Sequence, residues 1–322
     1  MNYRNYHDLI KLVWENLDQI PEVDIVVGIP RSGMIPASVI ALQLNKPLLT
    51  FDAFLKNEAP RAGERLKINY EQLNNSELKV LIVDDSISTG NELNKKKRLL
   101  KKEEIDCDYK FLCVYSSPES VEMPDFYFEV IETPRIFQWN ILNQYYLSKS
   151  CLDMDGVLCL DPTEEENDDG ENYREFCLNA KPLFIPNYKI GHIVTSRLEK
   201  FRKETEFWLK KRGVKYGQLH MMQYNDAVER RRANKYGEFK AGIFIETESV
   251  MFIESDPKQS KIIHALTNKP VFCTDSMEFY PYHLKDLYIK NPVSLSRRIK
   301  LKFLFKQMGV VFKKIQNKFN NL

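Results

Sequence analysis

Two adjacent carboxylates end an apolar run and pass directly into a turn rich in hydroxyl groups. Residues 80–90 read Val-Leu-Ile-Val-Asp-Asp-Ser-Ile-Ser-Thr-Gly, and the first four have the length and β-branching of a strand buried on both faces. Asp84 and Asp85 are then expected at the carboxyl end of this strand, where open α/β sheets bind ligands and where carboxylates can hold sugar hydroxyls or Mg²⁺. The turn can surround a phosphate at the start of the next helix. Its expected ligand groups belong to Ser86, Ser88, Thr89 and Gly90.

This order of strand, acid pair and hydroxyl-rich loop resembles the phosphoribosyl diphosphate (PRPP) motif of the type I phosphoribosyltransferases. A second part of that family pattern lies at residues 24–33, an apolar strand that ends in a Gly-rich turn. The resemblance implies that Arg31, Ser32 and Gly33 face the leaving diphosphate. It also implies that the basic segment 56–69 closes over the site, although such a segment taken alone is more typical of a solvated surface loop.

A separate chemical signal lies at residues 151–159, which read Cys-Leu-Asp-Met-Asp-Gly-Val-Leu-Cys. Successive side chains of an extended strand point to opposite sides, so Asp153 and Asp155 project together while Met154 points away. One carboxylate can then attack phosphorus while the other handles the proton. Taken alone, however, a lone Asp-x-Asp is usually structural.

This segment resembles the first motif of the haloacid dehalogenase-like phosphatases, and residues of the other three motifs follow in order: Thr195, Lys240, and Glu254 with Asp256. The resemblance implies that Asp153 is the nucleophile and that Asp155 is the acid and base. It implies a Mg²⁺ ion held by Asp153, the carbonyl of Asp155, and Glu254 or Asp256. Thr195 and Lys240 would stabilise charge on the transferring phosphoryl group.

Two of these assignments stay open at the level of sequence. The last motif reads Glu254-Ser255-Asp256 rather than the commoner Asp-Asp or Gly-Asp, so either acid could be the direct metal ligand. Lys235 and Lys258 also lie close enough in sequence to compete with Lys240.

Length and composition fit two catalytic domains. The 322 residues, 43% hydrophobic and 29% charged, can bury two cores of ordinary size. We expect an α/β protein of two doubly wound domains, a type I phosphoribosyltransferase fold at 1–148 and a Rossmann-like haloacid dehalogenase-type phosphatase fold at 149–295. A basic amphipathic helix is expected at 296–322. The net charge of +2 is too small to indicate a nucleic-acid binder.

The remaining sequence features bear on location. The six cysteines form no Cys-x-x-Cys pair and the five histidines form no ligand-spaced cluster, so neither a disulfide framework nor a structural zinc site is indicated. This use of cysteine favours the reducing cytoplasm. No apolar run reaches the roughly 20 residues that span a bilayer. The basic tail is a candidate contact with the inner face of the membrane, a helix packed on the protein itself and a disordered tail being the alternatives.

The pairing of the two domains indicates the acceptor. A phosphatase beside a nucleobase transferase would destroy the nucleotide just made, whereas beside a glycan transferase it would leave a plain ribofuranosyl residue. Residues 1–295 resemble the dual-domain ribofuranosyltransferases of bacterial surface polysaccharide assembly, which implies PRPP and a lipid-linked glycan as partners. A nucleobase phosphoribosyltransferase fused to a nucleotide or sugar phosphatase stays the main alternative, with Phe137 or Trp139 as a base-stacking ring or as core. A non-catalytic PRPP sensor is disfavoured because both motif sets are complete.

Overall fold

The computed structural model describes residues 1–60 and 78–281. The chain divides into two compact units, of which the first begins at Met1 and ends at Trp139 and the second runs from Asn140 to Leu284. The expected loop 56–69 lies largely outside the described residues, and the expected tail 296–322 lies wholly outside them. No helix within 1–60 and 78–281 is long and apolar enough to cross a membrane.

The first unit is a parallel five-stranded sheet with helices on both faces. Its strands are β1 (Asn2–Arg4), β2 (Ile25–Gly28), β3 (Leu48–Thr50), β4 (Lys79–Ile87), β5 (Asp108–Ser116), β6 (Phe126–Val130) and β7 (Arg135–Phe137). Its helices are α1 (Tyr6–Glu15), α2 (Met34–Leu44), α3 (Phe51–Leu55) and α4 (Asn91–Lys102), with short 3₁₀ turns at Leu17–Gln19, Pro118–Ser120 and Gln138–Asn140. The main sheet has the order β3-β2-β4-β5-β6, and β1 pairs with β7 separately.

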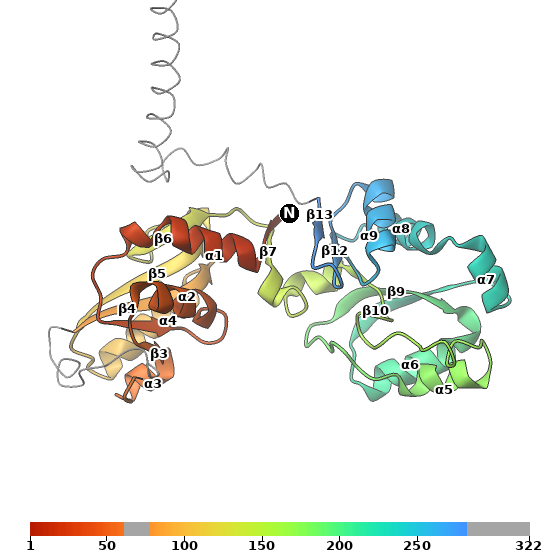
Figure 1. Cartoon of the computed structure of the whole chain (residues 1–322), viewed down its shortest axis with the longest axis horizontal. Helices are drawn as coiled ribbons and strands as arrows, with labels where there is room; N and C mark the ends of the chain where they lie inside the picture. Colours follow the sequence, from red (N-terminus) through yellow and green to blue (C-terminus); the bar gives the residue numbers. More distant parts are fainter. Residues whose placement is uncertain (61–77, 282–322) are drawn as a thin grey trace, which may run out of the picture. The chain divides into compact units, whose positions relative to one another are not determined.

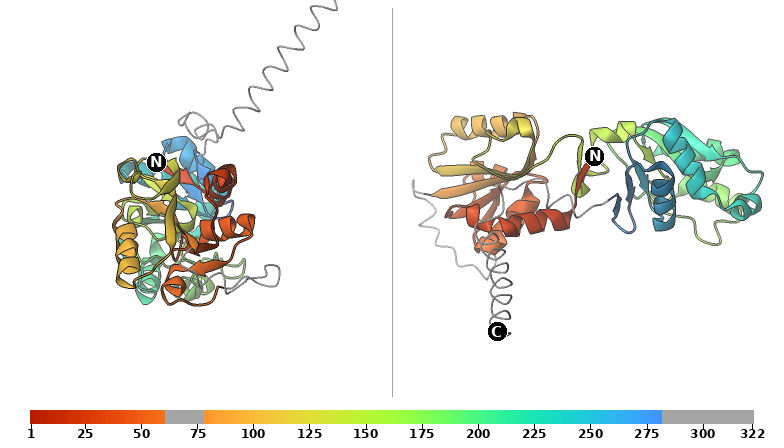
Figure 2. Two further views of the ribbon diagram at one scale, coloured as in Figure 1. Left: turned by 90° about the vertical axis from the view of Figure 1, so that its left-hand side faces the viewer. Right: turned by 90° about the horizontal axis from the view of Figure 1, so that it is seen from above.

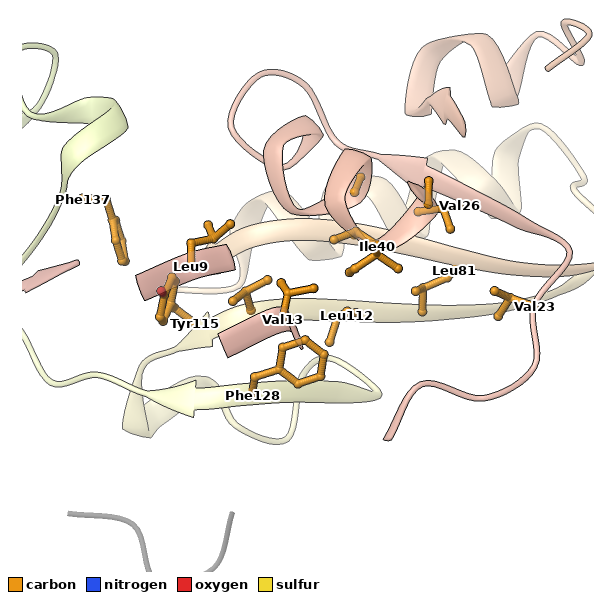
Figure 3. Packing of buried hydrophobic residues seen from close by; sticks show 14 of the residues in the cluster. Leu9, Val13, Val23, Val26, Ile40, Leu81, Leu112, Tyr115, Phe128 and Phe137 are labelled. Carbon is orange, nitrogen blue, oxygen red and sulfur yellow. The ribbon is translucent and has the colours of Figure 1, made fainter. Parts of the chain in front are cut away.

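The core of this unit lies on both faces of β4. Leu81 and Val83 pack with α1 and α2 on one face, and Val80 and Ile82 pack with α4 on the other. Figure 2 shows the sheet between these two helical layers, and Figure 3 shows residues of the first cluster. Alternate residues of a strand point to opposite faces, so an apolar run of this kind is buried on both.

The second unit carries a six-stranded sheet of order β10-β9-β8-β11-β12-β13, parallel except at β13. Its strands are β8 (Cys151–Leu152), β9 (Ile190–Leu198), β10 (Tyr216–Met222), β11 (Phe252–Glu254), β12 (Val271–Cys273) and β13 (Phe279–Tyr280). Its helices are α5 (Glu171–Asn179), α6 (Arg202–Lys211), α7 (Ala227–Ala233), α8 (Tyr236–Glu246) and α9 (Pro257–Thr267), with 3₁₀ turns η5 (Tyr145–Lys149) and η6 (Glu199–Phe201). Figure 1 shows α8 and α9 on one face of the sheet and α5 and α6 on the other.

Two boundaries differ from the sequence expectation. The units divide at Trp139 rather than after residue 148, because the turn η5 packs on β9 of the second sheet. The acid pair lies within β4 rather than after it, because pairing with β5 continues through Ser86–Tyr115 and Ile87–Ser116. Both differences depend on long-range contacts.

Candidate active sites

The acid pair and the Gly-rich turn of the first unit meet at the point where the strand order reverses. The chain passes from β2 to β3 on one side of the sheet and later returns to β4 on the other side of β2. Ile29 in the turn donates its backbone N–H to the carbonyl of Val83 at 2.9 Å. A Cβ atom at Gly33 would lie 2.8 Å from Oδ1 of Asp84, so only glycine allows this approach. The crevice at such a reversal is where doubly wound sheets bind ligands.

The two carboxylates of this crevice have different environments. Asp85 is buried, and its Oδ2 accepts a hydrogen bond from Nε1 of Trp139 at 2.7 Å. Oδ1 of Asp84 accepts from the backbone N–H of Asp85 at 2.9 Å. Burial and the adjacent negative charge of Asp85 raise the pKa of Asp84 well above its ordinary value. The pair therefore suits ligands that bring hydroxyl donors or a cation.

The hydroxyl-rich loop leads from β4 into α4. Ser88 and Thr89 are exposed, while the carbonyl of Ser88 accepts hydrogen bonds from Oγ of Ser117 at 2.8 Å and of Ser120 at 2.5 Å. Gly90 has a φ of 73° and precedes the first residue of α4. The backbone of the loop is thus held in place while its hydroxyls stay open at a helix N-terminus, a suitable setting for a phosphate. Arg31 of the Gly-rich turn is exposed, Ser32 is half-buried and Gly33 is buried.

The two aromatic candidates, Phe137 and Trp139, have different surroundings. The rings of Phe137 and Trp139 stack with centroids 5.0 Å apart, and Phe137 also stacks on Tyr115 at 5.2 Å. Phe137 is buried in the first core cluster, whereas Trp139 is partly buried at its edge and bonded to Asp85. Trp139 is therefore the ring that lies at the acid pair.

In the second unit, Lys240 joins two of the predicted acids. Leu152 of β8 pairs with Ile253 of β11, which brings Asp153 beside Glu254 where this sheet reverses its order. Nζ of Lys240, on α8, donates to Asp153 at 2.6 Å and to Glu254 at 2.7 Å. Burial and the charge of Glu254 raise the pKa of Asp153 well above its ordinary value. Burial lowers the pKa of Lys240, but the two carboxylates raise it by more. The pKa of Lys240 therefore lies above its ordinary value, and the lysine stays charged.

Asp155 is held by Arg197. The Nε and Nη2 of this fully buried guanidinium donate to the carboxylate, Nη2 at 2.6 Å from Oδ1. Thr195 of β9 lies opposite Met221 of β10, but Leu198 lies opposite Met222, so an irregularity in β9 carries Arg197. Bulges commonly re-aim side chains beside ligand sites. Thr195 itself is buried, and its Oγ1 accepts from the backbone N–H of Arg197 at 3.2 Å.

The polar groups of the last motif, Glu254-Ser255-Asp256, each make different contacts. Oε1 of Glu254 accepts the backbone N–H groups of Ser255 and Asp256 at 3.0 and 3.1 Å. Ser255 donates its hydroxyl to the carbonyl of Asp155 at 3.3 Å. The Asp256 carboxylate caps α9 by accepting from the N–H groups of Lys258 and Gln259. Glu254, rather than Asp256, is thus the acid that contacts Lys240.

These groups line one cavity of about 620 Å³. Of the predicted residues, Asp153, Asp155, Lys240, Glu254 and Asp256 line it, together with Lys258, while Thr195 and Lys235 do not. No group of three or more His, Cys, Asp or Glu side chains within 1–60 and 78–281 is placed to hold a metal ion by itself.

The family comparison covers the first unit. Residues 2–148 match the family described as the phosphoribosyl transferase domain. This segment is a type I phosphoribosyltransferase domain. Its activity is phosphoribosyl transfer, and PRPP as the donor is consistent with this domain.

Solved structures are similar to part of the chain. A purine phosphoribosyltransferase from Pyrococcus horikoshii is 23% identical, with 43% of this chain and 92% of that chain covered and a TM-score of 0.33. A xanthine-guanine-hypoxanthine phosphoribosyltransferase from Helicobacter pylori is 15% identical, with 44% and 92% covered and a TM-score of 0.33. None of the curated proteins matches the sequence.

Sequence reasoning missed three contacts at these sites. It named Trp139 as a ring for stacking but not as the partner of Asp85 in the phosphoribosyltransferase domain. It passed over Arg197, and it passed over Arg230, which stands in a run of three arginines and lines the cavity of the second unit. The position of Arg197 directly after Thr195 and Ser196 was the only available signal.

Proposed function

We propose that this protein is a two-step ribofuranosyltransferase. The phosphoribosyltransferase domain transfers 5-phosphoribosyl from PRPP to a hydroxyl of a glycan acceptor, of polysaccharide, O-antigen or capsule type. The second unit, a haloacid dehalogenase-like phosphatase, then removes the 5-phosphate. The proposal rests above all on the cluster of Asp153, Lys240 and Glu254, which lines a cavity on the same chain as the transferase.

The glycan acceptor follows from what the two activities would make together. Transfer to a purine or pyrimidine followed by dephosphorylation would turn a nucleotide into a nucleoside and waste the donor. Transfer to a sugar hydroxyl followed by dephosphorylation gives a ribofuranosyl residue, and both steps then serve one product. We place this chemistry in the cytoplasm, with the basic segment 296–322 as a candidate contact with the lipid that carries the glycan.

In the transfer step, Asp84 and Asp85 accept hydrogen bonds from the ribose hydroxyls while residues 86–90 bind the 5-phosphate. The turn at residues 31–33 binds the diphosphate. The bond between the anomeric carbon and the diphosphate oxygen breaks, and the acceptor oxygen forms the new bond to that carbon. The acceptor hydroxyl loses its proton to a base, and diphosphate leaves.

In the phosphatase step, a carboxylate oxygen of Asp153 attacks phosphorus, and the bond between phosphorus and the oxygen on C5 of the ribose breaks. For this step Asp155 carries a proton in place of its ion pair with Arg197, and it gives that proton to the departing alkoxide. Water then attacks the aspartyl phosphate with Asp155 as base, which releases phosphate and restores Asp153. Lys240 stabilises negative charge on the phosphoryl oxygens throughout.

The donor set of the second site suits Mg²⁺. The carboxylates of Asp153 and Glu254 and the carbonyl of Asp155 are hard oxygen ligands. The two buried carboxylates share a single cation, Lys240, so a metal ion would balance the second negative charge when both are ionised. When bound, Mg²⁺ would neutralise charge on the phosphoryl oxygens.

The alternative function is a nucleobase phosphoribosyltransferase fused to a nucleotide or sugar phosphatase. One observation favours it, because Trp139 presents an aromatic ring at the acid pair, where a base could stack. The same ring could also stack on the apolar face of an acceptor sugar. The acceptor must therefore be tested directly.

The test is mass spectrometry of a panel of glycan acceptors and free bases incubated with PRPP and Mg²⁺. We expect the intact protein to add a pentose to a glycan and Asp153→Asn to add a pentose phosphate. Asp85→Asn, which can still accept from Trp139, should add neither. Glu164→Gln, an exposed change of the same kind, should behave like the intact protein.

Addition of ribose phosphate to a free base, with none to any glycan, would replace the proposal by the nucleobase alternative. Addition of pentose phosphate to a glycan by the intact protein itself would remove the phosphatase step and leave the transferase.

A further inference from the structure

Arg230 is a buried cation for which the described residues supply no counter-ion. It lies on α7, is 7% exposed, and lines the same cavity as Asp153 and Lys240. The other two buried cations of this cavity are paired, Arg197 with Asp155 and Lys240 with two carboxylates. Among the described residues, no carboxylate forms an ion pair with Arg230. A buried charge without such a partner is unfavourable unless a ligand supplies one.

The hydrogen bonds of Arg230 are also incomplete. Nη1 donates to the carbonyl oxygen of Ser196 at 2.8 Å, but the buried Nε has no acceptor among the described residues. The hydroxyl of Ser196, which lines the same cavity, is likewise buried without a partner in this part of the chain. Two buried donors, Nε of Arg230 and the hydroxyl of Ser196, therefore have no acceptor in the part of the chain that the structure describes.

The placement of these donors indicates what they bind. Ser196 follows Thr195 on β9, in the irregularity that also carries Arg197, and β9 pairs with β8, the strand directly before Asp153. A neutral sugar would satisfy the hydroxyl but not the charge. A guanidinium presents a planar fork of N–H groups that matches the oxygens of a phosphate.

We propose that Arg230 and the hydroxyl of Ser196 bind the non-bridging oxygens of the phosphate monoester that enters this cavity. This inference rests on the proposed phosphatase function and adds to it a residue that recognises the substrate. Arg230 is then a substrate-binding residue, separate from the pair that carries out the reaction, Asp153 and Asp155.

The binding test uses the full chain with Asp153→Asn, which prevents turnover. Isothermal titration with ribose 5-phosphate in Mg²⁺ should show a Kd about 10- to 100-fold weaker when Arg230→Met is added, as expected for lost charged hydrogen bonds. Arg230→Lys keeps the charge but not the fork and should lie between the two. Arg231→Met is the matched control, since it removes the same charge from an exposed position on the same helix. Glucuronate in place of ribose 5-phosphate tests whether a carboxylate serves as well.

Thermal unfolding without ligand separates a binding role of Arg230 from a purely structural role, because the two roles predict different changes in the unfolding temperature. Because replacing Arg230 breaks no ion pair within residues 1–60 and 78–281, Arg230→Met should unfold at a temperature no lower than that of the parent. A lower temperature together with unchanged binding would make Arg230 a structural residue. If Arg230→Met fails to fold, the Lys variant decides, and an unchanged Kd in that variant overturns the inference.

The remaining outcomes separate this inference from the proposed function. Equal Kd values for Arg230→Met and its parent overturn the role of Arg230, and the phosphatase stands if the protein with Asp153 intact still releases phosphate from an ester. Equal weakening by Arg231→Met replaces a direct contact by a long-range effect of charge. Tighter binding of glucuronate than of ribose 5-phosphate overturns the assignment to phosphate. Absence of both ester hydrolysis and binding overturns the inference and the phosphatase together.

Discussion

At the scale of single residues, Arg197 determines where Asp155 can be. Its guanidinium donates to both oxygens of Asp155 and to Oγ1 of Thr205 at 3.3 Å, and it lies over the ring of Phe176 at 5.1 Å from the centroid. A side chain held by so many contacts has little freedom, so the carboxylate it binds is also fixed. Arg197 is therefore a positioning residue for the acid and base of the proposed phosphatase.

Replacing Arg197 by Met should destabilise the second unit. The variant removes one partner of a buried ion pair, which commonly costs about 3–5 kcal/mol. Urea unfolding of the full chain should show the loss in the transition of the second unit. Asp155→Asn should cost less when added to Arg197→Met than when made alone, because the two groups interact directly. Strictly additive changes would mean that the pair contributes little to stability.

At the scale of elements, Gly90 connects β4 to α4. Its φ of 73° lies in the left-handed region that side chains disfavour, and a Cβ atom there would lie 2.0 Å from Sδ of Met123. The glycine thus allows the hydroxyl-rich loop to turn into the helix and pack against Met123. The loop geometry depends on this residue as much as on the hydroxyls themselves.

Gly90→Ala should therefore weaken PRPP binding and destabilise the phosphoribosyltransferase domain by about 1–3 kcal/mol. Gly242→Ala is the natural control, because Gly242 lies inside α8 with open space where a Cβ atom would lie. That change should stabilise the protein by about 0.5–1 kcal/mol, since alanine favours the helix. Chemical denaturation of both variants, with PRPP binding by calorimetry, measures the contrast. Equal PRPP affinity in Gly90→Ala and the parent would show that the loop tolerates the distortion.

The elements also show how far sequence reasoning extends. The strand at Val80 and the helix at Met34–Leu44 could be predicted because an apolar run and a Gly-rich turn are local signals. The end of β4 could not, since it depends on pairing with β5. The choice of Lys240 among three lysines, and the burial of Arg230 beside exposed Arg231, depend on how α8 and α7 pack. Such contacts link residues far apart in the chain and leave no local pattern.

At the scale of the whole molecule, the two proposed sites share no residue. Asp84 and Asp85 lie on the sheet of the first unit, and Asp153, Lys240 and Glu254 lie on or beside the sheet of the second. Each sheet has its own buried clusters of apolar side chains. A change that removes one acid should therefore leave the other site intact, and the intermediate that joins the two steps is the glycan that carries ribose 5-phosphate.

This separation predicts complementation between two inactive variants. Asp85→Asn alone should transfer nothing, and Asp153→Asn alone should stop at the phosphorylated glycan. Mixed with PRPP, Mg²⁺ and acceptor, the two proteins should yield the plain ribofuranosyl glycan, because the product of one is free to diffuse to the other. Mass spectrometry of the mixture over time measures this. A mixture that accumulates only the phosphorylated glycan, although each variant keeps its remaining activity, would mean that the intermediate passes between the two sites without leaving the chain.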